Sequence, residues 1–159
     1  MPMADLNGSI TYNGTQLNAV TETNTAGQTV IAGCKVHYFD PSAVEIRQFT
    51  EPLALVDGID TGGAWLGARH ITIKGTVYDS TRQLTAARID ALETLFKLAS
   101  GTMSFFDLVF ATMAGSTKTI SCRSDGLRYA SDASKHGGLD AQPMAIEWAV
   151  NLYAKNPTF

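Results

Sequence analysis

The sequence predicts a mainly β domain of the α+β class, an antiparallel β-sandwich with one long flanking α-helix at about residues 81–100. Several segments alternate apolar and polar residues with the period of two expected of strands that have one buried face. One segment instead has the 3.6-residue period of an amphipathic helix, and turn-forming residues separate the alternating segments. No internal repeat or long linker divides the chain, so residues 1–159 are expected to form a single domain.

The first predicted element is a hairpin near the N-terminus. Residues 9–12 and 15–20 are strand-like, and the Asn13-Gly14 pair between them favours a tight two-residue turn. We therefore expect the two segments to pair with each other.

The next part of the chain is interpreted as two strands followed by a loop. Residues 35–39 and 43–49 are rich in β-formers, and Asp40-Pro41-Ser42 between them predicts a turn. Residues 53–56 are expected to form a short edge piece, because Pro52 excludes them from a central position. Residues 57–64 are rich in Gly and Asp and are expected to be a flexible loop.

A half-exposed strand then leads directly into the helix. From Arg69 onward one side of the strand is apolar and the other is polar; the apolar side holds Ile71, Ile73 and Val77, and the other holds His70, Thr72, Lys74 and Tyr78. Ser80-Thr81-Arg82-Gln83 fits a capping box, in which the Ser and Gln side chains satisfy backbone N–H groups at a helix start.

The helix is expected to bury one face and to stop near Ser100, where Gly101 suits the left-handed conformation of a helix end. Arg88 is an exception, because it lies in the arc of apolar residues. Either its stem snorkels to the rim, or it pairs with an acid across a subunit boundary. The apolar half of the helix holds Leu84, Ile89, Leu92, Leu95, Phe96, Leu98 and Ala99.

The C-terminal third predicts three more strands. Residues 103–110 are apolar on both faces, as in a central strand, and residues 118–123 follow a Gly115-Ser116 turn. Residues 124–141 are rich in Ser, Asp and Gly and have only two apolar anchors, Leu127 and Tyr129. The last strand has a fixed register, because Ile146, Trp148, Val150 and Leu152 alternate with polar or small residues.

Composition favours an assembling protein over a nucleic-acid binder. Only 17% of the residues are charged, whereas a well-solvated surface commonly has about 25–35%; a weakly charged monomer remains the alternative. The net charge of −3 and the scattered basic residues argue against a protein that grips phosphates. The chain has neither a signal-like N-terminus nor a membrane-length apolar run, so we expect synthesis in a cytoplasm and no membrane insertion.

Residues with catalytic or metal-binding chemistry form no recognisable constellation. Cys34 and Cys122 lie in strand-like segments and are expected to be buried free thiols. His37, His70 and His136 lack the spacing of a zinc site, and no Gly-x-Ser-x-Gly elbow occurs. We expect no enzyme activity, no cofactor and no metal.

One part of the chain resembles a known family. The strand at residues 69–77, the break Asp79-Ser80-Thr81-Arg82 and the helical run at residues 89–95 resemble the N-terminal domain of the distal tail proteins of long-tailed bacteriophages. That family shares its sandwich-plus-helix fold with phage tail tube proteins. The resemblance implies a tail-tube-like fold and a structural virion protein at the tail tip. It also implies a homohexameric ring that joins the tail tube protein to the hub proteins of the tip complex.

The implied ring encloses a channel through which DNA only passes. Family members often carry a further C-terminal domain that recruits host-binding proteins; this chain ends soon after its last predicted strand, so no such docking role is expected. Candidate lumen or subunit contacts are Glu45, Arg47, Thr72, Lys74 and Arg88, with ordinary solvent-facing residues as the alternative.

Two other functions remain open. A major tail tube subunit would stack into many rings through long loops, for which residues 20–31 and 124–141 are candidates. A monomeric β-sandwich binding module, for instance for carbohydrate, would need a cluster of exposed aromatic residues. Trp65 falls in the predicted loop and Trp148 in an apolar register, which disfavours the module.

Overall fold

The computed structural model describes residues 3–18, 29–52, 59–97, 104–130 and 144–156. These residues form eight β-strands and one α-helix, which confirms the predicted mainly β class. Among the described elements, the helix has neither the length nor the hydropathy needed to cross a membrane. In chain order the elements are β1 (Ile10–Tyr12), β2 (Thr15–Gln16), β3 (Thr29–Val30), β4 (Cys34–Pro52), β5 (Ile59–Asp79), α1 (Arg82–Leu95), β6 (Phe106–Ala111), β7 (Thr117–Ala130) and β8 (Met144–Ala154).

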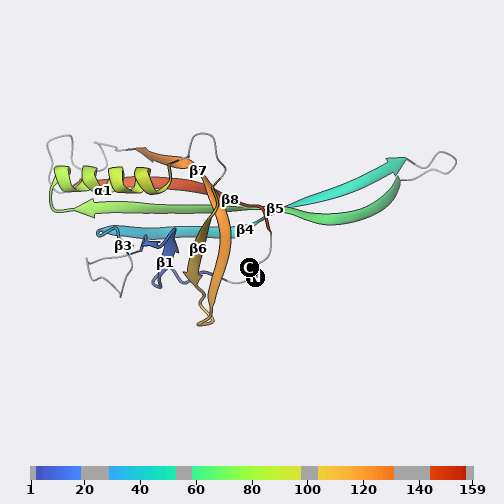
Figure 1. Cartoon of the computed structure of the whole chain (residues 1–159), viewed down its shortest axis with the longest axis horizontal. Coiled ribbons are helices and arrows are strands. Elements are labelled where there is room, and N and C mark those ends of the chain that lie inside the picture. Colours follow the sequence, from blue (N-terminus) through green and yellow to red (C-terminus); the bar gives the residue numbers. More distant parts are fainter. Residues whose placement is uncertain (1–2, 19–28, 53–58, 98–103, 131–143, 157–159) are drawn as a thin grey trace.

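The eight described strands form one continuous sheet that folds into two layers at β7, and neighbouring strands are antiparallel, as predicted, except for the parallel pair β2 and β3. The strand order is β3-β2-β1-β6-β7-β8-β5-β4; residues 117–122 of β7 pair with β6, and residues 123–130 pair with β8. The register shifts between Ser124 and Leu127, where Gly126 has a φ of 100°. A bulge of this kind bends a strand. Figure 1 shows β6 and the first part of β7 running across the direction of β5 and β8, so the layers cross as in a sandwich.

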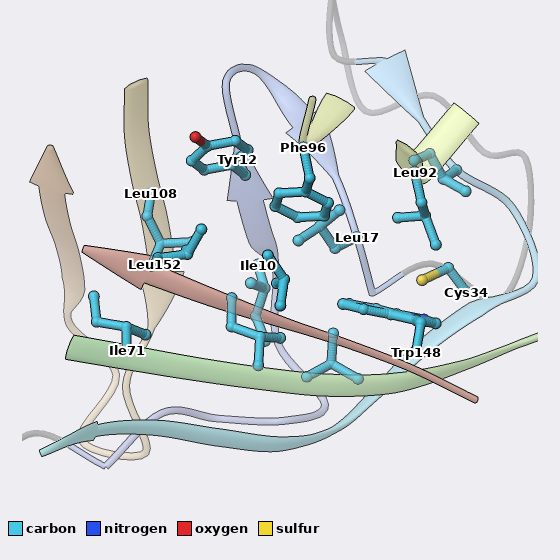
Figure 2. Packing of buried hydrophobic residues seen from close by; sticks show 14 of the residues in the cluster. Ile10, Tyr12, Leu17, Cys34, Ile71, Leu92, Phe96, Leu108, Trp148 and Leu152 are labelled. Atoms are coloured by element: carbon cyan, nitrogen blue, oxygen red, sulfur yellow. The ribbon is translucent and has the colours of Figure 1, made fainter. Parts of the chain in front are cut away.

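The core lies between the two layers and under the helix. Phe39 of β4 packs against Phe110 of β6 with ring centroids 4.7 Å apart, which joins the two layers directly. Phe96, just after α1, stacks on Tyr12 at 5.0 Å and approaches Trp148 at 6.3 Å. Figure 2 shows Leu92 and Phe96 reaching down toward the Trp148 indole, with Cys34 beside it. Both cysteines are buried free thiols, as predicted, and burial raises the pKa of each to about 12.

The two alternating strands have the predicted registers. The apolar side of β5 is completely buried at Ile71, Ile73 and Val77. Gly75 continues this row, and a Cβ atom there would lie 2.6 Å from the Trp148 ring and from the Lys35 carbonyl oxygen. The absence of a side chain at this position makes room for the indole. The buried side of β8 holds Ile146, Trp148, Val150 and Leu152.

Both ends of the helix differ from the prediction. Thr81, not Ser80, is the N-cap, and its side chain accepts a hydrogen bond from the Leu84 N–H at 3.2 Å. The predicted capping box is wrong because the Ser80 N–H donates to Asp79 Oδ1 instead. The helix also ends at Leu95 rather than near residue 100, because Phe96 leaves the helical conformation and is buried in the core. Leu98, Ala99 and Gly101 lie outside the described residues.

Both predicted tight turns are present. Asn13 and Gly14 have positive φ angles of 48° and 74°, which suit a two-residue hairpin turn between β1 and β2. Gly115, with a φ of 80°, turns the chain from β6 to β7.

Three segments interpreted as turns or loops are strands. Asp40-Pro41-Ser42 does not reverse the chain; it forms a bulge inside β4, where the register with β5 shifts between Asp40 and Ala43. Residues 59–64, together with Trp65, belong to β5, because they pair with the far end of β4. Residues 124–130 belong to β7, because they pair with β8. In each case long-range pairing overrides local Gly and Pro content. Residues 53–58 and 131–141 lie outside the described part.

Candidate assembly surface

The most distinctive feature of the molecule is a projecting hairpin, here called the arm, made of residues 43–52 of β4 and 59–68 of β5. Strand β8 pairs with β5 only from Asp79 to Arg69, whereas β4 and β5 stay paired as far as Pro52 and Ile59. Figure 1 shows the arm extending away from the sandwich along the long axis. A two-stranded ribbon by itself is marginally stable in water and has unpaired backbone groups on both edges. The arm is therefore the part of the described chain that gains most from a partner.

The base of the arm is held by a buried arginine. Arg69 is only 8% exposed, and its Nη1 donates a hydrogen bond to the carbonyl oxygen of Pro41 in the β4 bulge. Burial lowers the pKa of the Arg69 guanidinium from its ordinary value. Next to this contact, a Cβ atom at Gly67 would lie 3.0 Å from the carbonyl oxygen of Glu45, so the two strands approach closely there.

The second candidate surface is the open face, the side of the β7-β8-β5-β4 layer that points away from the core. One row of Cα partners crosses this layer through Tyr38, Lys74, Ala149 and Arg128. Lys74 Nζ lies 5.1 Å from the centroid of the Tyr38 ring. Because Ala149 is small, Lys74 and Arg128 border a hollow of about 330 Å³, which Glu147 also lines.

Neighbouring rows of the open face are polar as well. Thr72 Oγ1 donates to Asn151 Oδ1 at 3.1 Å. The Arg123 guanidinium lies over the Tyr153 ring at 5.1 Å, and His70 contacts the same ring edge-on. The open face therefore carries both signs of charge and no large apolar cluster among the described residues. Within those residues, no group of three or more His, Cys, Asp or Glu side chains is placed to share a metal ion.

The residues singled out from the sequence fall on three separate parts of the structure. Thr72 and Lys74 lie together on the open face, as their spacing predicted. Glu45 and Arg47 lie on the arm, where Glu45 is exposed and Arg47 is the Cα partner of Trp65. Arg88 lies on α1.

Arg88 has an acidic partner within its own chain. Its Nε donates to Asp79 Oδ2 at 3.4 Å, and the Arg88 side chain is 26% exposed. The pKa of Asp79 is lowered, first by the hydrogen bond from the Ser80 backbone N–H and then by Arg88. The ion pair links the end of β5 to the first half of the helix.

Arg69 and Arg128 are among the residues of these surfaces that were not identified from the sequence. Arg128 was missed because its segment was interpreted as a loop. Arg69 was missed because only apolar residues were assigned to the buried side of this strand. Arg69 has the same alternation as Ile71 and Ile73, and this position could have indicated a buried cation.

Comparisons with known proteins identify the fold. No family model and no curated protein matches the chain. Among solved structures it is similar to the crystal structure of the Dit protein of SPP1, described as a paradigm of the hub adsorption apparatus in phages that infect Gram-positive bacteria. The TM-score is 0.62 at 18% sequence identity, over 94% of this chain and 50% of the other, so this chain spans half the length of that protein. The likeness confirms, at the level of fold, the resemblance to distal tail proteins.

Proposed function

We propose that this protein is a structural subunit of a bacteriophage tail and acts at the distal end of that tail. The observation that carries the proposal is the fold match, over 94% of the chain, to a hub protein of a phage adsorption apparatus. The sparse charge of the chain, 17% of its residues, supports a surface that is largely covered in an assembly. The proposed mechanism is assembly rather than catalysis, and the proposed location is the virion tail tip.

The proposed assembly is a closed homohexameric ring built through the arm. At about 3.4 Å per residue, ten arm residues of β4 span roughly 30 Å. A folded domain of 159 residues has a radius of gyration of about 15 Å. An arm of roughly 30 Å therefore reaches well across a neighbouring copy. We propose that the arm docks on a different surface of the neighbouring copy, which makes the contact head-to-tail. Contacts of this kind generate a ring when the rotation closes.

Within this ring the open face is proposed to line the channel. Thr72 and Lys74 are the candidate lining residues, and Glu45 and Arg47 on the arm are the candidate subunit contacts. The proposed neighbours are the tail tube protein on one side of the ring and the hub proteins of the tip on the other. DNA is proposed to pass through without being held.

The mass of the purified protein tests the proposal, measured by native mass spectrometry and viewed by negative-stain microscopy. Closed six-membered rings, formed alone or with tail partner proteins, are the expected result. Open tubes of indefinite length would favour a tail tube subunit instead, since a head-to-tail contact also permits stacking. A protein that stays monomeric and does not bind the tail partner proteins would contradict the ring proposal.

One observation bears on a second candidate function, the monomeric binding module. Tyr38 and Tyr78 of the open face are 43% and 52% exposed. They do not form a cluster, because Tyr38 lies across from Lys74, four residues along β5 from Tyr78, a separation of roughly 13 Å. A monomer that binds a soluble oligosaccharide through these tyrosines would replace the ring proposal.

A further inference from the structure

We propose that Arg69 is a positioning residue that fixes the direction in which the arm leaves the body, and that this direction delivers the arm to a second copy of this chain. The first half of the inference concerns the isolated subunit alone. The second half rests on the proposed function.

The position of Arg69 in the fold makes it the last fixed point before the arm. Its backbone is the final part of β5 that pairs with β8, opposite Ala154. On the other side it is the Cα partner of Val44, the second arm residue of β4. Strand pairing therefore holds β5 on both sides up to Arg69 and on one side beyond it.

The side chain of Arg69 satisfies a group that the bulge would otherwise leave without a partner. The bulge between Asp40 and Ala43 takes Pro41 out of the ladder with β5, and Pro41 is buried. A buried carbonyl without a donor is costly, and Pro has no N–H with which to rejoin the ladder. The charged hydrogen bond from Arg69 Nη1 meets this need and is stronger than a neutral one.

The same contact restrains rotation of the arm. Register shifts between Asp40 and Ala43 and between Val44 and Ile46 interrupt β4 at the arm base, and bulges are the places where a ribbon bends and twists. The Arg69 to Pro41 hydrogen bond ties the first of these bulges to the rigid part of β5. The planar guanidinium fits this task because its donors are fixed in one plane.

The first experiment measures the arm direction in isolated subunits. Spin labels are placed at Gln48→Cys on the arm and Ser121→Cys on the body, and their distance distribution is recorded by pulsed electron resonance. Cys34 and Cys122 are buried with raised pKa values, so they do not compete for the label. With Arg69 present a single narrow distance is expected. Arg69→Met keeps the apolar stem but removes the donors, and the distribution should at least double in width.

Matched variants keep the result interpretable. Arg82→Met removes one positive charge at the start of α1, away from the arm, and should leave the width unchanged. Arg69→Lys retains the charge but has a single donor nitrogen on a flexible stem, so an intermediate width is expected even if Arg69→Met proves too unstable to study. Equal widths in wild-type protein and in whichever Arg69 variant folds would overturn the inference.

The second experiment measures assembly with the same variants. Arg69→Met should raise the subunit concentration needed for half-maximal ring formation by about tenfold or more, as expected for the loss of one charged hydrogen bond that orients each contact. If wild-type protein forms no ring but Arg69→Met still broadens the arm distance, the proposed function fails and the positioning role stands. If rings form equally well with a broadened arm, the link between arm direction and assembly is refuted.

Discussion

Trp148 shows how one side chain dictates the identity of its neighbours. The indole is 2% exposed and lies over Gly75 on the adjacent strand, between Cys34 and Phe96, the residue after the helix. Every heavy atom added at position 75 enters space that the ring or the Lys35 carbonyl already fills. A glycine inside a strand normally weakens it, so its presence here reflects packing rather than flexibility.

Gly75→Ala should therefore destabilise the fold, although alanine is the better strand residue. Overpacking of a dense core costs about 1–3 kcal/mol, and chemical denaturation would measure the loss. The exposed change Thr119→Ala on β7 serves as the control and should stay within about 0.5 kcal/mol. An unchanged midpoint for Gly75→Ala would mean that Trp148 can shift freely.

Asp79 makes stability depend on acidity. Its pKa is lowered in the folded chain by the Ser80 N–H and by Arg88, so its charged form favours folding at neutral pH. This contribution is present above the ordinary aspartate pKa of about 3.9 and is lost as the pH falls through the lower folded value. The stability difference between wild type and Asp79→Asn should shrink on acidification through that window. A difference independent of pH between 7 and about 2 would contradict the assignment.

Among the elements, the helix offers a contrast between its two faces. Leu92 is completely buried and Glu93 is exposed, although they are adjacent in sequence. Leu92→Ala should cost about 2–5 kcal/mol through lost burial and a cavity. Glu93→Ala should cost only a few tenths. Equal small losses for both in a denaturant titration would show that the helix does not pack on the sheets.

Elements with one buried face were predictable, because apolar residues recur along the sequence at the spacing that places them on the face packed against the core. Strands β5 and β8 follow their apolar rows, and α1 buries Ile89 and Leu92. The β5 half of the arm was not predictable in the same way. Residues 43–49 of β4 were recognised as a strand, whereas residues 59–64 of β5 show no apolar alternation and the Gly62-Gly63 pair locally favours a loop. What makes this segment a strand is pairing with β4, which is long-range information.

In the candidate surfaces, too, local periodicity was predictable from the sequence and long-range pairing was not. Thr72 and Lys74 were placed on one face correctly, since strand alternation alone decides it. Their neighbour Arg128 required the pairing of β7 with β8, and Arg69 required the bulge at Pro41. The sequence contains these residues but does not show which of them meet.

At the scale of the whole molecule, the net charge determines how strongly the protein binds a polyanion such as DNA. The chain carries a net charge of −3, and the open-face cations Lys74 and Arg128 share their hollow with Glu147. A band-shift titration at roughly 0.15 M salt should therefore show DNA binding weaker than about 10⁻⁴ M. Glu147→Lys should strengthen binding and steepen its salt dependence, because it replaces an anion with a cation in the same hollow. Micromolar binding by the unaltered protein would refute a passive channel.

Among the described strands β4 lies at one end of the sheet, and this position has a consequence for the isolated subunit. A long unpaired edge strand invites other chains to add to it, which is the usual start of aggregation. Here Pro41 and Pro52 each remove a backbone donor, and four register shifts keep the edge from being straight. An added strand would find matching backbone groups over only a few residues at a time. We therefore expect the isolated subunits to form no fibrils through this irregular edge.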